Sequence, residues 1–164
     1  MGEIRFEEMK DEFLPEVMRI YNYYIMNSTA TFHSKELNLE DMRAIVYTGA
    51  ERFKSFVIKD GERICGYSIL SPFKKREAYD ATAEVTVYLD DACTGKGVGS
   101  KAIKHLEDVA KDNDFHVLLA IICGENDSSI KLFHKLGYEK CAHYKEVGKK
   151  FGRLLDVVSY QKII

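Results

Sequence analysis

Three glycines alternate with other residues in segment 94–100 (TGKGVGS), between a strand-like apolar run and a helix-like run. Glycines at this spacing let the backbone turn tightly and leave its N–H groups uncovered. Those groups, together with the positive end of the following helix, form a site for phosphate oxygens. Three alternating glycines exceed what a simple strand-to-helix turn needs, so the pattern predicts a phosphate-binding loop.

Two common phosphate-binding motifs do not fit this loop. A Walker A loop requires G-x-x-x-x-G-K-[ST], but the Gly-Lys pair of this loop is followed by Gly97. A dinucleotide-binding fingerprint requires G-x-G-x-x-G after the first strand, whereas this G-x-G-x-G segment lies in mid-chain. The spacing disfavours both a nucleoside triphosphate and a dinucleotide as the ligand.

Length and charge narrow the class of protein. The chain has 164 residues, which predicts one domain spanning 1–164, and its formal charge is −2, so a basic surface for nucleic acid or an anionic membrane is not expected. The longest apolar run, residues 117–123, is too short to cross a bilayer, and the acidic N-terminus lacks the basic start of a signal peptide. We therefore expect a cytoplasmic protein.

The four cysteines, at positions 65, 93, 123 and 141, lack the spacing of metal ligands. We expect no metal site, and we expect reduced, buried thiols. Cys93 is the exception, because it stands beside the glycine-rich turn and is expected to be exposed.

Hydrophobic periodicity predicts an alternation of strands and helices. The expected strands are residues 4–6, 55–58, 63–70, 82–89, 115–123, 140–147 and 154–161, and the expected helices are residues 14–26, 39–46, 100–111 and 128–136. Asn38 can cap the second helix, and Asp60-Gly61 predicts a hairpin turn. Strand 115–123 is apolar throughout and is expected to be covered on both faces. The order of elements predicts a mixed α/β sheet with helices packed on it.

Segment 94–99 resembles the [QR]-x-x-G-x-[GA] pyrophosphate loop of the GNAT-superfamily N-acetyltransferases, with Thr94 at the Gln/Arg position. Further segments are similar to the phosphinothricin and methionine sulfoximine acetyltransferases of that superfamily. These are Ile20-Tyr21-Asn22 with Thr29 and Phe32, and residues 75–89 (KREAYDATAEVTVYL), 126–130 (NDSSI), 136–138 (LGY) and 147–157 (VGKKFGRLLDV). The resemblance covers nearly the whole chain in order.

This resemblance implies a GNAT-like mixed β-sheet with splayed central parallel strands, helices on both faces, and acetyl-CoA as co-substrate in the cleft between those strands. The implied cofactor-binding residues are Val87, Tyr88 and Leu89 for the pantetheine arm, Thr94, Gly95, Lys96, Gly97, Val98, Gly99 and Ser100 for the pyrophosphate, and Asn126. From the residues alone, Asn126 can also be an ordinary helix cap.

Glu84 is the candidate catalytic residue. In a strand, Glu84, Thr86 and Tyr88 share one face, opposite Val85 and its apolar neighbours. A carboxylate there is unfavourable unless it is hydrated or paired, which predicts a polar cleft on that face. A partly desolvated Glu has a raised pKa and can accept the proton that an ammonium must lose before it attacks an acetyl group. The resemblance places the general base here; the alternative is a strand Glu exposed at a sheet face.

The resemblance also marks candidate substrate-binding residues. Arg76 matches the position associated with the substrate's acidic end, and a guanidinium suits a carboxylate because it donates two parallel hydrogen bonds. A solvated surface base is the alternative for Arg76. Phe32 and Tyr79, with Phe73, are candidates for an apolar wall, and Thr86 shares the face of Glu84.

A second basic cluster, Lys149, Lys150 and Arg153, could meet substrate or a partner subunit. We expect it to be a solvated face instead.

Two positions depart from the family pattern. Phe133 stands where relatives carry Tyr or His, and a phenyl ring cannot protonate a departing thiolate; His134, next to it, is expected to point to the surface. Leu154 stands where the family has Trp, and the chain has no Trp, so a Trp-lined substrate pocket would be reshaped.

Together these features predict an acetyl-CoA-dependent N-acetyltransferase that acts on the α-amine of a small amino acid or analogue through a ternary complex. The resemblance implies a homodimer. Two alternatives stay open: acetylation of another amine (a peptide N-terminus, a polyamine or an aminoglycoside), and a non-catalytic acyl-CoA-binding sensor.

Overall fold

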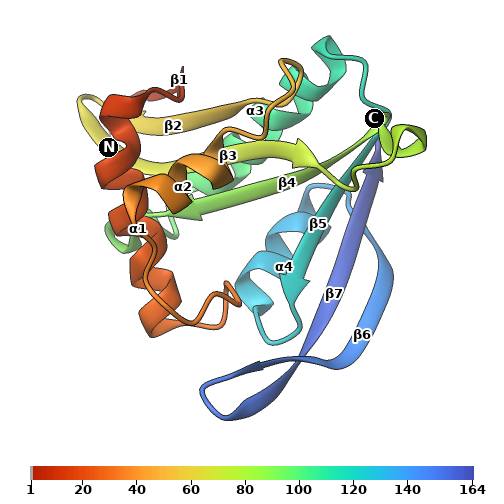
Figure 1. Cartoon of the computed structure of the whole chain (residues 1–164). Coiled ribbons are helices and arrows are strands. Elements are labelled where there is room, and N and C mark those ends of the chain that lie inside the picture. The colour runs from red at the N-terminus through yellow and green to blue at the C-terminus, as the bar shows by residue number, and fades with distance from the viewer. Residues whose placement is uncertain (1) are drawn as a thin grey trace.

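The structure is a computed structural model that describes residues 2–164, and its strands form one seven-stranded sheet in the order β1-β2-β3-β4-β5-β7-β6 (Figure 1). The strands are β1 (Ile4–Glu8), β2 (Ser55–Asp60), β3 (Arg63–Pro72), β4 (Thr82–Leu89), β5 (Val117–Cys123), β6 (Glu139–Lys150) and β7 (Arg153–Ile163). The α-helices are α1 (Leu14–Asn27), α2 (Leu39–Val46), α3 (Val98–Asp112) and α4 (Asp127–Lys135), and three short 3-10 turns are η1 (Asp11–Phe13), η2 (Glu77–Tyr79) and η3 (Asp91–Cys93). The predicted mixed α/β class is confirmed.

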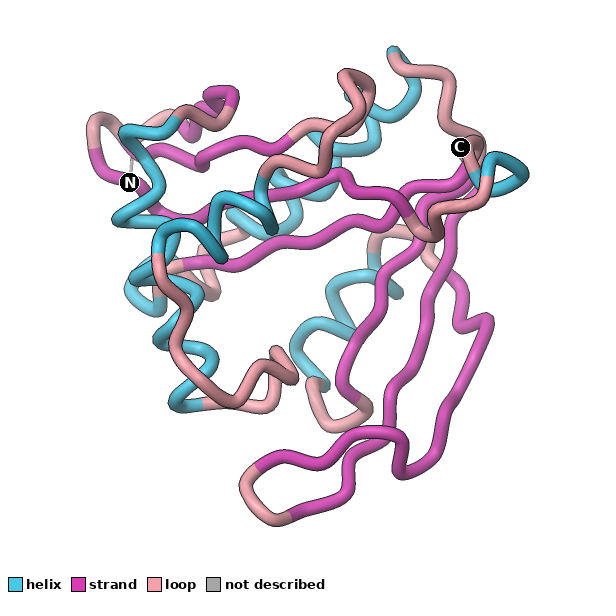
Figure 2. The backbone as a smooth tube through the Cα atoms, in the orientation of Figure 1, coloured by secondary structure: helices cyan, strands magenta, loops and turns pink. Residues whose placement is uncertain are grey.

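The central strands β4 and β5 run parallel and pair over three residues only, from Thr82 opposite Val117 to Glu84 opposite Leu119. Beyond that point β4 continues against β3 and β5 continues against β7, both antiparallel. The sheet therefore opens in its middle, and Figure 2 shows the two halves diverging. This confirms the predicted splay of the central parallel strands.

Helices cover both faces of the sheet, as expected. On one face, α3 contributes Ile103, Leu106 and Ala110 to a core that includes Val85 of β4. On the other face, α1 contributes Val17, Ile20 and Ile25 to a core with Tyr67 and Ile69 of β3. Because successive side chains of a strand alternate between faces, β4 sends Val85 toward α3 and its neighbours in sequence toward α1.

Local signals fix the helix starts. The Asp41 N–H donates to Asn38 Oδ1 at 2.9 Å, and the Asp41 carboxylate accepts from the Asn38 N–H at 3.4 Å, so α2 begins with the predicted cap as part of a capping box. Helix α3 begins at Val98, two residues earlier than predicted, because Gly97 is its N-cap and adopts a positive φ of 77°.

Three expectations about the exposure of the cysteines and of β5 were wrong. Cys93 is buried, with 3% of its surface exposed, because η3 folds back onto β3 and brings the Cys93 thiol to the Cys65 sulfur at 2.7 Å. Cys141, which was expected to be buried, is exposed on the edge strand β6. Ile121 of β5 is 42% exposed because it lies where the sheet has opened, so β5 is not covered on both faces along its whole length.

Candidate active site

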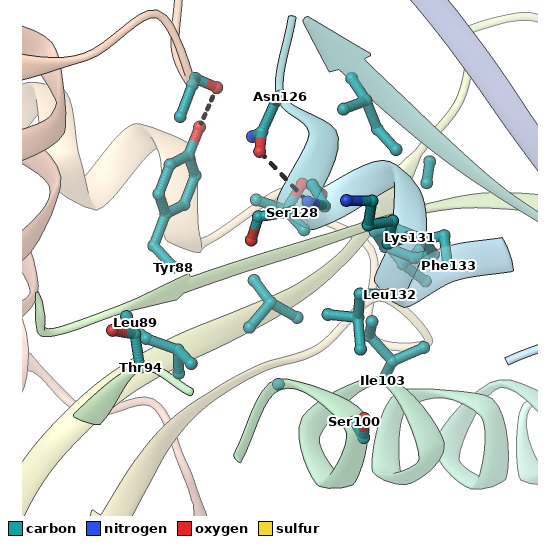
Figure 3. A pocket seen from close by; sticks show the side chains of 18 of the residues that line it. Tyr88, Leu89, Thr94, Ser100, Ile103, Asn126, Ser128, Lys131, Leu132 and Phe133 are labelled. Atoms are coloured by element: carbon teal, nitrogen blue, oxygen red, sulfur yellow. Dashed lines mark hydrogen bonds between the residues drawn. The ribbon is translucent and has the colours of Figure 1, made fainter. Parts of the chain in front are cut away.

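A cleft of about 540 Å³ lies where β4 and β5 part, between the glycine-rich loop and α4 (Figure 3). Most of the predicted cofactor-binding residues line it: Val87, Tyr88, Leu89, Thr94, Gly95, Gly97, Gly99, Ser100 and Asn126. Two members of the predicted set lie outside the lining. Val98 is buried beneath the loop beside Ile58 and Ala102, and the Lys96 ammonium turns back to donate to the carbonyl of Ala92 at 2.8 Å.

The glycines of the loop have different physical roles. Gly95 and Gly97 adopt positive φ values of 71° and 77°, which residues with a Cβ rarely adopt. Gly99 lies in the first turn of α3, where an added Cβ would approach Leu132 of α4 at 3.1 Å. The loop thus presents the N-terminal turn of α3, which carries no acidic residue, toward the cleft. Uncovered N–H groups at such a terminus bind anionic oxygens.

The start of the loop is held by an ion-pair network. The Asp90 carboxylate pairs with both Arg19 and Arg63 and also accepts from the Ala92 N–H at 3.0 Å. The Arg19 hydrogen bond, with further support from Ala92, holds the pKa of Asp90 below its usual value. Tyr24 adds a hydrogen bond to the Leu89 carbonyl at 2.7 Å. The last residues of β4 are therefore fixed in place before the chain enters the glycine-rich loop.

Glu84 lines the cleft at the closed end of the splay, because it is the last residue of β4 paired with β5. Burial raises the pKa of its carboxyl group. Within residues 2–164 the carboxylate has neither a hydrogen-bonding nor an ion-pairing side-chain partner. A carboxyl group with a raised pKa and free oxygens can take up a proton, directly or through water.

Thr86 and Tyr88 follow Glu84 on the same face of β4, and both line the cleft. The Tyr88 hydroxyl donates to the carbonyl of Ala30 at 3.1 Å, which joins the cleft to the loop after α1 (Figure 3). The ring of Tyr88 packs on Tyr21 and Tyr24 with centroid separations of 5.0 and 5.2 Å. Burial among these rings raises the pKa of Tyr88, so this phenol stays protonated near neutral pH.

Asn126 occupies the cleft side of the β5–α4 turn and also caps α4. Its Oδ1 accepts from the Ser129 N–H at 3.2 Å (Figure 3). The helix-cap interpretation is therefore confirmed, while the side chain still lines the cleft. The first turns of α4 add Ser128 and Lys131 to the lining, two residues that sequence reasoning missed. Their spacing after the Asn126 cap places them on one helical face, which is the signal that could have found them.

Phe133 of α4 lines the cleft and is buried, packing edge-to-face on Tyr138 at a centroid distance of 4.9 Å. His134 is exposed, as expected. Phe133 therefore contributes an apolar surface to the cleft and no exchangeable proton.

The other candidate substrate residues are not brought into the cleft lining. Arg76 and Tyr79 lie on the β3–β4 connection, with the Arg76 guanidinium 6.0 Å from the Tyr79 ring, and Phe73 packs edge-to-face on that ring. Phe32 lies on the loop after α1 and packs on Gly148 of β6. Of the predicted substrate set, only Thr86 shares the cleft with Glu84.

The expectation of a solvated basic cluster on the C-terminal hairpin was wrong for one of its three members. Lys149 is exposed and Arg153 forms an ion pair with Glu125 at 2.9 Å. Lys150 is buried, because its ammonium donates to backbone carbonyls of the loop after α1.

Clusters of metal ligands and membrane-spanning helices are both absent from the described residues. Across residues 2–164, no three His, Cys, Asp or Glu side chains gather as a metal-binding group. Within the same residues, each helix is too short or too polar to pass through a bilayer.

Known proteins resemble this chain over nearly its full length. Residues 7–158 match the family described as an acetyltransferase (GNAT) domain. A phosphinothricin N-acetyltransferase of Streptomyces coelicolor is 29% identical over 98% of this chain and 96% of its own. An L-methionine sulfoximine/L-methionine sulfone acetyltransferase of Pseudomonas aeruginosa is 32% identical over 90% of this chain and 87% of its own. The crystal structure of a GNAT-superfamily phosphinothricin acetyltransferase from Sinorhizobium meliloti in complex with acetyl-CoA superposes with a TM-score of 0.93, at 27% identity, over 98% of this chain and 88% of that one.

Proposed function

The chain belongs to the GNAT acetyltransferase family and is an N-acetyltransferase that uses acetyl-CoA, and from this premise we propose that it acetylates the α-amine of a small amino acid or amino-acid analogue. The observation that carries the proposal is Glu84, a partly buried carboxyl group that lies where β4 and β5 part and has no side-chain partner within residues 2–164. The named substrates of the relatives, phosphinothricin, methionine sulfoximine and methionine sulfone, supply the substrate class.

The cleft suits acetyl-CoA in two respects. Beyond Glu84, the edge of β4 that faces β5 has no strand partner within residues 2–164. Backbone groups of Val87 and the N–H of Leu89 are therefore available to the amide groups of a pantetheine arm, while the Leu89 carbonyl already accepts from Tyr24. The uncovered N–H groups of the loop and of the first turn of α3 suit a pyrophosphate. When bound, acetyl-CoA supplies the activated acetyl group.

Glu84 would act as the general base in a ternary complex. An amino-acid ammonium becomes a nucleophile only after losing a proton, and a Glu84 oxygen can accept it directly or through one water. A two-step route would instead require an acyl-carrying nucleophile, and Cys93 is buried outside the cleft lining. Phe133 offers no proton at the position where relatives carry Tyr or His, so solvent would protonate the departing sulfur.

The proposed acceptor site places the amine beside Glu84 and Thr86. Arg76 is exposed on the connection that leads into β4, and we propose that its guanidinium pairs with the acceptor's acidic end. Tyr79 and Phe32 would add apolar contact outside the cleft. This arrangement favours small acidic acceptors over polycations.

We further propose that residues 1–164 form one domain that works in the cytoplasm as a homodimer. Support for the dimer comes from apolar side chains exposed on the β6–β7 hairpin: Tyr144, Val147, Phe151 and Leu154. Sedimentation velocity measures the oligomeric state, and a monomer at micromolar concentration would contradict this part of the proposal.

The test is CoA release, followed by mass spectrometry, against methionine sulfoximine, methionine sulfone, phosphinothricin, common amino acids, a polyamine and an aminoglycoside. We expect turnover confined to amino acids and their analogues. Glu84→Gln should lower kcat by roughly 100-fold or more while acetyl-CoA affinity stays within a few-fold. Glu62→Gln, an exposed carboxylate in the β2–β3 turn, is the matched control.

Other outcomes point to the alternatives. Arg76→Ala should raise the acceptor KM with little change in kcat. Tight acetyl-CoA binding without turnover on any acceptor would favour the sensor, and turnover on the polyamine or aminoglycoside alone would overturn the substrate class.

A further inference from the structure

Lys150 is a buried cation that the proposed chemistry does not use. It lies at the end of β6 with 4% of its surface exposed, and its ammonium donates to the carbonyls of Ser28 and Thr31, each at 2.7 Å. Within residues 2–164 no carboxylate pairs with it. Because burying an unpaired ammonium is costly, these two carbonyls provide its main compensation.

The hairpin turn places a second cation beside the first. Phe151 and Gly152 both adopt positive φ values, 50° and 72°, which is the conformation of a two-residue turn that matches strand twist. This turn sets Lys150 directly opposite Arg153. Arg153 donates to both oxygens of Glu125 at 2.9 Å, and Glu125 Oε1 accepts from the Thr29 hydroxyl at 2.7 Å. The hairpin tip therefore holds the loop after α1 at two points.

The same short loop also reaches the cleft. Ala30, between Thr29 and Thr31, lines the cleft, and its carbonyl accepts from the Tyr88 hydroxyl. Residues 28–31, which we call the α1–α2 strap, are thus each bound by a side chain of another element. Phe32 continues the contact, since its ring leaves no room for a Cβ on Gly148. Figure 1 shows the β6–β7 hairpin reaching toward the loop that follows α1.

The strap lies on the side of β4 where we propose that the acceptor binds, and not on the side of the proposed phosphate-binding loop. Ala30 contacts Tyr88 on the face of β4 that also carries Glu84 and Thr86. The phosphate-binding loop leads into α3, which packs on the opposite face. An amine bound beside Glu84 and Thr86, as proposed, would therefore lie on the face of β4 that meets the strap.

We propose that Lys150 is a positioning residue that holds the α1–α2 strap against the cleft and thereby sets acceptor affinity without setting acetyl-CoA affinity. The acceptor half of this inference rests on the proposed function, whereas the placement of the strap does not. Burial lowers the pKa of Lys150, against a smaller opposing effect of Cys123, so the strap should loosen at alkaline pH before exposed lysines lose their charge.

The test compares Lys150→Met with Lys149→Met, which removes the same charge from the exposed neighbour. In Lys150→Met we expect amide hydrogen exchange in residues 28–33 to accelerate roughly tenfold and the acceptor KM to rise roughly tenfold. The variant loses both hydrogen bonds of the ammonium, and this loss is partly offset because it no longer buries a charge. The acetyl-CoA Kd and the exchange of α3 should stay within twofold. Lys149→Met should match the wild type in all four measurements.

Two further variants, Lys150→Gln and Glu125→Gln, test separately the two contacts that hold the strap. Lys150→Gln retains an N–H donor without the charge and should fall between wild type and Lys150→Met; it also serves if Lys150→Met fails to fold. Glu125→Gln weakens the second hold on the strap and should shift the same exchange in the same direction. Equal effects of the Lys150 and Lys149 variants, or equal losses of acceptor and acetyl-CoA affinity, would overturn the proposal. If the wild type acetylated no amino-acid analogue, the proposed function would fail, while hydrogen exchange would still decide the role of Lys150.

Discussion

Glu84 lies directly opposite Leu119, and this pair is the last contact between β4 and β5 before the two strands part. The carboxyl group is therefore fixed at the closed end of the cleft by the strand register and does not depend on a loop. Sites on strands hold geometry more firmly than sites on loops, so the sheet itself places the proposed general base.

Activity should depend on the ionisation of Glu84. A general base must be deprotonated, and burial raises the pKa of this group above the 4.5 of an unperturbed Glu. We expect kcat/KM to fall as pH drops through that raised pKa, and this acid limb to be absent from the residual activity of Glu84→Gln. A pH–rate profile with a fixed acceptor measures both. An acid limb that persists unchanged in the variant would assign the titration to another group.

The stability of the fold should change with pH in the opposite direction to the activity. Because the folded pKa of Glu84 is raised, its contribution to stability is present below the unfolded pKa and is lost as pH rises through the folded pKa. We therefore expect Glu84→Gln to raise the Tm relative to wild type at pH 8 and to match it near pH 4. Thermal unfolding of both proteins across this range is the measurement. A lower Tm for the variant at pH 8 would show that the carboxylate stabilises the fold.

Substitutions at two glycines should distinguish the cost of backbone strain from a loss of acetyl-CoA binding by the glycine-rich loop. Gly97 and Gly61 both have positive φ and open space where a Cβ would lie, but only Gly97 lines the cleft. Replacing either by Ala should cost about 1–2 kcal/mol of unfolding free energy, because a Cβ disfavours this backbone conformation. Only Gly97→Ala should weaken acetyl-CoA binding, by roughly tenfold. Denaturant titration and calorimetric binding test the two halves, and a matching loss of affinity in Gly61→Ala would contradict this role of the loop.

His105 should make the fold sensitive to mild acid. Its ring stacks on Phe6 at a centroid distance of 4.2 Å and meets Phe56 edge-on at 4.5 Å, and its Nδ1 has no partner within residues 2–164. Burial lowers its pKa below 6.5, against a smaller opposing effect of Asp108. The stability contribution of the neutral ring is therefore present above pH 6.5 and is lost as pH falls through the folded pKa. Urea unfolding from pH 8 to pH 5 should show this loss in wild type and less of it in His105→Phe.

Local sequence signals predicted what short stretches of chain determine by themselves. Strand 82–89 was predicted from the alternation of its residues, the Asn38 cap from its side chain, and the turn at Gly61 from a glycine that tolerates positive φ. Each of these signals lies in residues that are adjacent in sequence. The glycine-rich loop and the burial of Glu84 followed from the same kind of reasoning.

What escaped prediction depends on partners distant in sequence. Lys150 is buried because it donates to the carbonyls of Ser28 and Thr31, which precede it by 122 and 119 positions. Cys93 is buried against the sulfur of Cys65 in β3. Ile121 is exposed because the sheet opens beside it, which no pattern within β5 encodes. Arg76 and Phe32 were grouped with Glu84 through family resemblance, and only the three-dimensional arrangement separates them from the cleft lining.

The splay also has a consequence for solubility. Beyond Glu84, β4 presents an unpaired strand edge inside the sheet, and unpaired edges are the usual templates for intermolecular strand addition and aggregation. Here α4 and the glycine-rich loop flank that edge and line a cleft with it, so the edge is not open to solvent along its length as the outer strands β1 and β6 are. The opening of the sheet that the proposed cofactor site requires is thus flanked by elements that limit strand addition at this edge.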